Sequence, residues 1–273
     1  MFRRIGFDCK YADRNPIVRT KYMLITTIVN NIDIYERGLK KSLSEQAFSA
    51  YELKVINNTS NQYKSLYDAY KPVLDEKAYS SDVMFFCHPD IYFETTDELG
   101  RLVDCVTSIF FSDHSNIGVI GVAGASLGAV YEIYSTITHG DNKTKFQCSI
   151  FEDKDYVLCQ TIDACAYFVR SDILRKIPFN KNNNSFHLLI EEYSLRLRMD
   201  GINTAVIPAN IWHFSQGASL DYNYYREMKH VAAMHKECKY INTTSFQWKN
   251  DIILPFKLTY YSFRNYIHHI LFN

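Results

Sequence analysis

Residues 82–93 read DVMFFCHPDIYF, an apolar run that stops at a histidine, a proline and an aspartate. The run up to Cys87 is typical of a strand that is buried on both faces. Pro89 keeps the backbone extended, so the side chains of His88 and Asp90 can face the same side. We therefore expect a strand that delivers an imidazole and a carboxylate to its carboxyl end.

Strands and helices alternate on either side of this segment. Apolar runs predict further strands at residues 22–29 and 117–122. Another strand is predicted at 51–56, which stops at a turn-rich stretch. Helical spacing of apolar residues predicts helices at 33–48, 63–70 and 95–111. Such alternation implies right-handed crossovers and a mostly parallel sheet with helices on both faces. We predict an α/β, Rossmann-like fold.

The second half of the sequence is less regular. We expect a loop or small hairpin at residues 124–145, a buried strand pair at 157–169 and a strand at 202–207. Helices are expected at 171–176, 188–199, 220–238 and, with an amphipathic aromatic pattern, 256–272. The last pattern fits a membrane interface, or packing against the domain or a partner. The predicted divisions are an N-terminal extension (1–21), a catalytic domain (22–219) and a C-terminal helical appendage (220–273).

Composition limits the class of protein. The 273 residues are 47% hydrophobic, which suffices for one main domain, and 30 basic residues balance 30 acidic ones. Because the formal net charge is zero, the protein as a whole has no electrostatic field that would attract nucleic acid. The seven cysteines are scattered without a CxxC pair, so we expect buried, reduced thiols. With no secretory signal and no long apolar run, we expect a cytoplasmic protein of open oligomeric state.

Four kinds of residue could carry chemistry, and each has a structural alternative. His88 and Asp90, with phosphate oxygens, would suit Mn²⁺ or Mg²⁺, or they form a simple turn after a strand. Glu191 or Glu192, at the start of a helix, could act as general base, or the two could be a solvated pair. Asp163 lies in an apolar run, so its carboxylate must be paired or functional. His213 could be a ligand or a structural histidine with its hydrogen bonds satisfied.

Several common enzyme motifs are missing from the sequence. It contains no GxGxxG, GxxxxGK[ST] or HExxH pattern. Dinucleotide oxidoreductases, P-loop NTPases and zincins are therefore disfavoured.

Five segments in order resemble the family 2-like glycosyltransferases with a GT-A fold, over roughly residues 22–217. They are TTIVNN, KVINNTSN, FFCHPDIYF, TIDACAYFVR and FHLLIEEYSLRLRMDG. The third resembles a bacterial branch whose metal corner reads His-Gln-Asp. The fifth resembles the helix that carries the catalytic base. Proline inside the corner, and Glu192 where the family has aspartate, are departures that allow reduced activity.

The resemblance implies roles for these residues. Glu192 would be the base, with Glu191 as a further catalytic residue and Asp163 as a catalytic carboxylate near the sugar and acceptor. Asp90, His88 and His213 would hold Mn²⁺ or Mg²⁺. The nucleotide sugar would meet His88 and Asp90 together with Thr27, Val29, Asn30, Asn57 and Asn58.

The implied activity is inverting transfer, from what we expect to be a UDP-sugar, to a hydroxyl of a glycan or lipid-linked acceptor in bacterial surface polysaccharide or glycan synthesis. The C-terminal segment would suit peripheral contact with the inner face of the membrane. Two other functions remain open. One is a catalytically silent nucleotide-sugar-binding scaffold. The other is a metal-dependent phosphohydrolase.

Overall fold

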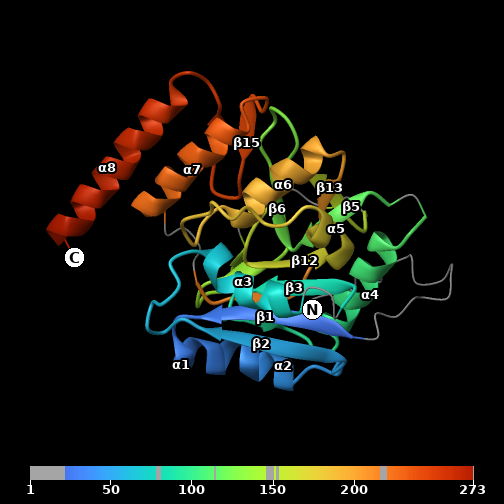
Figure 1. The fold of residues 1–273 in the computed structure, drawn as a ribbon. Helices are drawn as coiled ribbons and strands as arrows, with labels where there is room; N and C mark the ends of the chain where they lie inside the picture. The colour runs from blue at the N-terminus through green and yellow to red at the C-terminus, as the bar shows by residue number, and fades with distance from the viewer. Residues whose placement is uncertain are drawn as a thin grey trace.

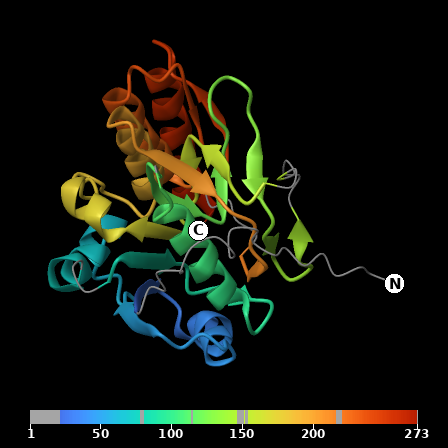
Figure 2. The same ribbon diagram turned by 90° about the vertical axis from the view of Figure 1, so that its right-hand side faces the viewer.

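The computed structural model describes residues 22–77, 81–113, 115–145, 151, 154–215 and 220–272. Its centre is a seven-stranded sheet in the order β10-β13-β5-β12-β3-β1-β2 (Figures 1 and 2). The strand bounds are β1 Met23–Val29, β2 Tyr51–Asn57, β3 Val83–Cys87, β5 Ile117–Gly121, β10 Val157–Cys159, β12 Ala166–Arg170 and β13 Asn203–Val206. Only β12 and β10 run opposite to the other five strands. The predicted mostly parallel α/β sheet is thus confirmed.

The central strands are buried on both faces. In β3, Phe85 contributes to the apolar core on one face and Phe86 to the core on the other. This explains why the strand sequence reads as a continuous apolar run. The first core includes side chains of α1 (Ile32–Tyr35), η2 (Glu36–Lys40), α2 (Lys41–Ser44) and α4 (Glu98–Phe110). The second includes side chains of α3 (Leu66–Lys77), α5 (Ser171–Lys176) and α6 (Leu189–Met199).

The first helical segment is kinked. Residues 32–44 form α1, η2 and α2 in succession, and Gly38 has the non-helical angles φ −95° and ψ −109°. The helix predicted for 33–48 is therefore interrupted at Gly38 and ends four residues early, at Ser44.

Short strands form two further sheets beside the main one. One contains β6 (Ala123–Ala125), β7 (Ile133–Ser135) and β11 (Thr161–Ile162). The other contains β4 (Ile91–Phe93), β14 (Ile211–His213), β8 (Thr138–His139) and β9 (Thr144–Lys145). The prediction of one loop or hairpin at 124–145, and of a strand pair at 157–169, was therefore too simple. Strands of two or three residues are too short to show a period of two in the sequence.

The C-terminal segment packs on α6. It consists of α7 (Tyr222–Met234), a hairpin of β15 (Tyr240–Asn242) and β16 (Gln247–Lys249), and α8 (Leu254–Phe272). A third apolar cluster joins α7, α8 and the hairpin to Leu188 and Leu195. Figure 1 shows α8 alongside α7 at the outer edge of the molecule. No described helix is long and apolar enough to cross a membrane.

Candidate functional site

The three residues predicted to hold a metal ion lie together at the carboxyl end of β3. His88 Nδ1 is 3.4 Å from His213 Nε2, and Asp90 Oδ1 is 3.2 Å from the same His213 nitrogen. The third distance, between His88 Nδ1 and Asp90 Oδ1, is 3.9 Å. We call these three residues the metal corner. Two imidazoles and a carboxylate that converge within these distances are a donor set that suits a divalent transition metal such as Mn²⁺.

Backbone contacts from three segments fix this corner. Strand β14 pairs with β4 so that His213 lies opposite Ile91, and the Phe214 N–H donates to the Asp90 carbonyl at 2.9 Å. The kinked helix donates the Leu39 N–H to the carbonyl of Pro89 at 3.1 Å. A Cβ placed on Gly38 would lie 2.8 Å from that same Pro89 oxygen. Close approach of the helix to the corner therefore requires glycine at position 38.

The structure adds two side chains to the corner that the sequence analysis missed. His139 Nδ1 lies 3.3 Å from His213 Nδ1, because β8 pairs with β14. Cys165 precedes β12, and its Sγ lies within 4.8 Å of a ring nitrogen of both His88 and His213. The sequence had shown Cys165 only as one of several cysteines in apolar runs. Its place beside β3 follows from the antiparallel insertion of β12.

Charge in the corner is concentrated on Asp90 and His213. Burial by itself raises the pKa of Asp90, but the hydrogen bond and charge of His213 outweigh it and lower that pKa to about 2. Burial likewise lowers the pKa of His213, but Cys165 and Asp90 raise it to about 11. Burial and the nearby His213 lower the pKa of His88. Without a metal ion, the proton on His213 therefore balances the charge of Asp90.

Asp163 connects the metal corner to α6. Its Oδ1 accepts from the Cys165 N–H at 2.8 Å, and its Oδ2 accepts from the hydroxyl of Thr244. Its negative charge partly opposes the lowering of the pKa of His88 and, after burial, contributes to the raised pKa of Glu191. Asp163 therefore has the structural pairing that the sequence allowed, and it also acts electrostatically on both groups.

The two glutamates of α6 have different surroundings, as expected for consecutive residues about 100° apart on a helix. Glu191 is only 8% exposed, and its Oε2 has no hydrogen-bond partner among the described residues. Burial, followed by the charge of Asp163, raises the pKa of Glu191 to about 8. Glu192 instead accepts from Arg196 through both carboxylate oxygens, at 3.0 and 3.3 Å, and lies 3.5 Å from His235. The predicted base is therefore held in an ion pair, whereas one carboxylate oxygen of its neighbour Glu191 has no partner among the described residues.

The predicted nucleotide-binding residues lie at the ends of two adjacent strands. Val29 ends β1 opposite Asn57, the last residue of β2, and Asn30 and Asn57 are exposed. Asn58 is buried, and its Oδ1 accepts from the Tyr63 N–H at 2.9 Å, so it shapes the loop. Thr27 is also buried in β1. Since β1 lies between β2 and β3, these strand ends and the metal corner share one edge of the sheet.

Comparison with solved structures identifies the fold. A mannosyltransferase from Pyrobaculum calidifontis, PcManGT, in complex with GDP-Man and Mn²⁺, matches 82% of this chain with a TM-score of 0.55 and 10% identity. GalNAc-T7 with UDP, GalNAc and Mn²⁺ matches 79% with a TM-score of 0.54 and 10% identity. The matches cover 66% and 48% of those chains, so this chain spans about two thirds and half of their lengths. No protein-family model matches the sequence, and a search of curated proteins found no relative. The chain therefore has the GT-A-type fold of nucleotide-sugar glycosyltransferases, as the sequence predicted.

Proposed function

We propose that this protein is a glycosyltransferase that moves a sugar from a nucleotide-sugar donor to an acceptor hydroxyl with inversion. The main support is the convergence of His88, Asp90 and His213 at the edge of the sheet where β1 and β2 end. In open α/β sheets ligands bind outside the carboxyl ends of the strands. The two structural neighbours were solved with nucleotides and Mn²⁺, which is consistent with this use of the fold.

The donor diphosphate would bind at the metal corner. Asp90, His88 and His213 would hold Mn²⁺ or Mg²⁺, and the carboxylate and two imidazoles fit Mn²⁺ better because Mg²⁺ prefers oxygen ligands. A divalent ion bound there would neutralise the charge that develops on the leaving diphosphate. The exposed Asn30 and Asn57 would contact the nucleotide beside it, with Val29, Thr27 and Asn58 shaping the strand ends.

We assign the general base to Glu191 in place of Glu192. A base must be free to accept a proton, and both oxygens of Glu192 are engaged by Arg196. Glu191 has an oxygen without a partner in the part of the chain that the structure describes, and its pKa of about 8 is close to the value that suits a base near neutral pH. It would take the proton of the acceptor hydroxyl as that oxygen attacks the anomeric carbon. Asp163, which raises the pKa of Glu191, would strengthen it as a base.

A single base that acts behind the anomeric carbon gives direct displacement and hence inversion. A retaining glycosidase would instead need a second carboxylate as nucleophile. Asp163 is already engaged by Thr244 and by the backbone of Cys165, so it is poorly placed for that duty.

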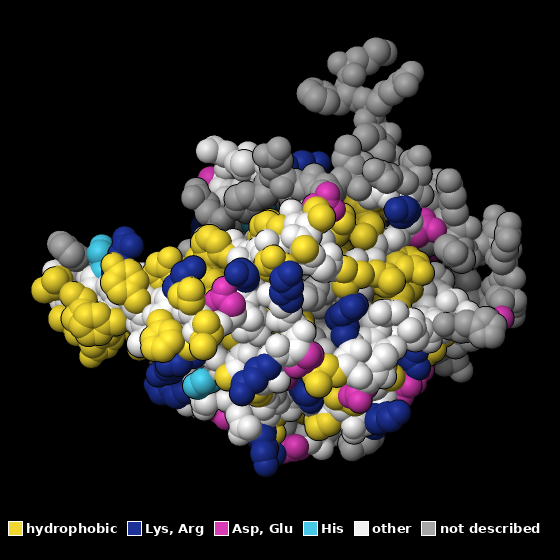
Figure 3. Space-filling view, turned by 90° about the horizontal axis from the view of Figure 1, so that it is seen from above, with side chains coloured by type: hydrophobic (Ala, Val, Ile, Leu, Met, Phe, Trp, Pro, Cys, Tyr) yellow, Lys and Arg dark blue, Asp and Glu magenta, His cyan; other side chains and the backbone are white. Residues whose placement is uncertain are grey.

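The exposed apolar side chains of α8 favour the proposal that the acceptor is linked to a lipid at a membrane surface. Leu254 and Leu258 are buried in the third cluster, yet large apolar side chains also cover the outer faces of the helix. The most exposed are Phe256 (75%), Phe263 (64%) and Leu271 (67%). Figure 3 shows hydrophobic side chains gathered at the projecting end of the molecule where α8 lies. Residues 252–273 contain Lys257 and Arg264 but no aspartate or glutamate. A helix with this composition is suited to lie in the interface of an anionic bilayer.

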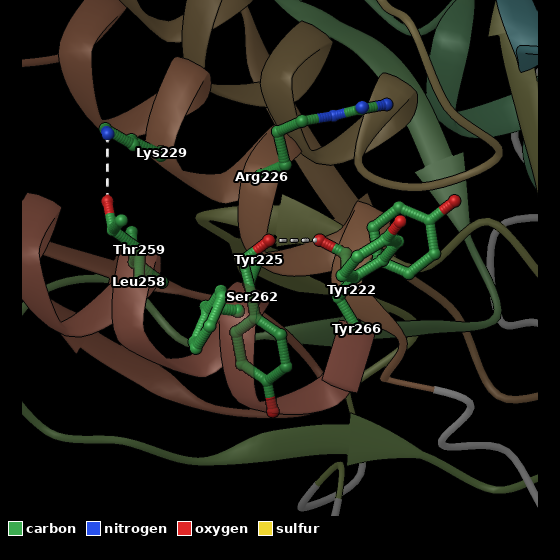
Figure 4. A pocket seen from close by; sticks show the side chains of 9 residues that line it. Tyr222, Tyr225, Arg226, Lys229, Leu258, Thr259, Ser262 and Tyr266 are labelled. Carbon is green, nitrogen blue, oxygen red and sulfur yellow. Dashed lines mark hydrogen bonds between the residues drawn. The ribbon is translucent and has the colours of Figure 1, made fainter. Parts of the chain in front are cut away.

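A groove between α7 and α8 adds a site for an anionic headgroup. It has a volume of about 360 Å³ and is lined by aromatic side chains together with Arg226 and Lys229 (Figure 4). The Lys229 ammonium donates to the hydroxyl of Thr259 at 2.9 Å, which holds it at the groove. A lipid phosphate beside apolar chains would match this combination of cations and aromatic rings.

Thermal unfolding with nucleotide sugars tests the proposed function. UDP-sugars and GDP-sugars would each be added with and without Mn²⁺, because a ligand at about 100 times its Kd adds about 2.7 kcal/mol. We expect a metal-dependent rise in the unfolding midpoint that Asp90→Ala abolishes, followed by transfer to an acceptor in a coupled assay. Binding without transfer to any acceptor would instead identify a silent scaffold. Hydrolysis of simple phosphoesters without acceptor would identify a phosphohydrolase.

A further inference from the structure

We infer that the two imidazoles of the metal corner also bind a thiophilic ion, Zn²⁺, with the thiolate of Cys165 as third protein ligand. One ligand atom from each of His88, Cys165 and His213 lies within 4.8 Å of the other two. The inference builds on the proposed function, because it predicts which ions compete at the same site. Binding of Zn²⁺ itself, however, requires neither donor nor acceptor.

The spacing of the two imidazoles already suits zinc. Nitrogens that share one tetrahedral zinc ion, at Zn–N distances of about 2.0–2.1 Å, lie about 3.3–3.4 Å apart. His88 Nδ1 and His213 Nε2 are 3.4 Å apart. The pair therefore needs little rearrangement to bind one ion.

Cys165 is held firmly next to this pair. Its carbonyl accepts from the His88 N–H at 2.8 Å, and its own N–H donates to Asp163. The side chain is only 2% exposed, and the thiol interacts with the His213 ring. A buried thiol beside two histidines is an unusual neighbour for an ion that prefers oxygen, but it is a common zinc ligand.

Zinc and manganese would exclude each other here. Asp90, a hard oxygen ligand, and Cys165, a soft sulfur ligand, both contact His213. An ion held by either set uses the same two imidazoles. When Zn²⁺ binds, the Cys165 S–H bond breaks and His213 loses the proton that it holds towards Asp90. Both protons pass to solvent, and S–Zn and N–Zn bonds form with no change of oxidation state. We therefore expect Zn²⁺ to displace Mn²⁺ and to inhibit the transferase.

Cobalt provides the direct test because Co²⁺ takes zinc sites and reports its ligands in its spectrum. The purified full chain would be titrated with Co²⁺ and then with Zn²⁺. We expect a near-ultraviolet thiolate-to-cobalt charge-transfer band that Zn²⁺ abolishes. Cys165→Ser should lose the band and weaken Zn²⁺ binding at least about 100-fold, since even partners outside the ligand set contribute about 10–100-fold.

Cys159→Ser is the matched control, because Cys159 is a buried free thiol outside the cluster. It should keep both the band and the affinity. His213→Ala provides a second test that does not alter the thiol, and it should lose both. Circular dichroism and the unfolding midpoint would establish that each variant is folded, with Cys165→Ala replacing the serine variant if needed.

The inference is overturned if folded Cys165→Ser binds Zn²⁺ as wild type does, or if wild type shows no thiolate band. If the band is present but no nucleotide sugar binds with Mn²⁺, the zinc site stands and the proposed transferase function fails. The two failures are therefore distinguishable.

Discussion

His88 Nδ1 and His213 Nε2 lie 3.4 Å apart although 125 positions separate the two residues in the chain. The contact exists because β14 pairs with β4, the strand that directly follows the His-Pro-Asp turn. Asp90 lies 3.2 Å from the same His213 nitrogen, so the histidine completes the metal corner. The consequences can be tested by substitution.

Replacing His213 should weaken metal-dependent nucleotide binding. His213→Ala removes one of three donors, so we expect the Kd for Mn²⁺ to rise at least about 10–100-fold. The measurement is calorimetric titration of Mn²⁺ in the presence of UDP or GDP. His230→Ala, which alters a half-exposed histidine on α7, should leave the Kd unchanged. Equal losses in the two variants would argue against a role for His213 in metal binding.

The two glutamates of α6 should behave differently. Glu191→Gln should abolish turnover while leaving donor binding intact, because it removes the base and keeps the shape. Glu192→Gln should mainly lower the free energy of unfolding, by about 1–3 kcal/mol, through loss of its charged hydrogen bonds to Arg196. Rates under saturating donor and urea unfolding of both variants separate the effects. A dead Glu192→Gln that keeps full stability would return the base to Glu192.

The pH dependence of stability should identify Glu191 as a buried neutral acid. Its pKa of about 8 exceeds the ordinary value of 4.5, so between these values the folded state binds more protons than the unfolded state. The stabilisation is therefore complete below about pH 4.5 and is lost as the pH rises through about 8. Glu191→Gln should lose less stability than wild type over that range in thermal melts. Turnover of wild type should rise as Glu191 ionises, and parallel stability curves for both proteins would contradict the assignment.

Glycine 38 should be required for the geometry of the corner. In Gly38→Ala the new Cβ would lie 2.8 Å from the Pro89 oxygen, and we expect a cost of about 1–3 kcal/mol together with weaker Mn²⁺ binding. Gly100→Ala is the matched control, because its nearest contact is an ordinary 3.5 Å to Phe48 and it lies within α4. Alanine should be neutral or stabilising there. Unfolding midpoints and metal titrations of both variants provide the comparison.

Helix α8 should bind anionic membranes. We expect the protein to float with vesicles that contain phosphatidylglycerol, and less with neutral phosphatidylcholine vesicles. The double variant Phe256→Ser with Phe263→Ser should lose flotation, while Val130→Ser, at an equally exposed site in the loop between β6 and β7, should retain it. A protein that stays in solution with both vesicle types but elutes as a dimer would show that α8 instead contacts a second copy of the chain.

The parts of the fold that could be predicted are those in which a hydrophobic pattern continues over several residues. Strands β1, β3 and β5 are apolar runs, β2 ends at a turn-rich stretch, and α5 lies where the sequence predicted it. The kink at Gly38 was hidden, because it depends on the close approach to Pro89, which is distant in sequence. The hairpin of β15 and β16 was also missed, since three-residue strands carry too little pattern.

The sequence predicted which residues belong to the candidate site, but not which side chains contact one another there. The residue pattern after the strand pointed to His88 and Asp90, the family resemblance implied His213, and the structure places the three together. Spacing could not show that Arg196 engages Glu192, since a charge four residues away on a helix can also be solvated. Nor could it place His139 or Cys165, which reach the corner through short strands and through the reversed direction of β12.

The antiparallel insertion of β12 between β3 and β5 has a consequence for how the chain acquires its structure. The metal corner and the Cys165 thiol beside it draw their side chains from residues 88, 90, 165 and 213. The site therefore cannot be complete until nearly the whole α/β domain has emerged from the ribosome and assembled. Contacts so distant in sequence form late and slowly in folding. A metal ion that binds only the finished corner would therefore select complete molecules from partly folded ones, and its uptake would mark the moment of maturation during synthesis.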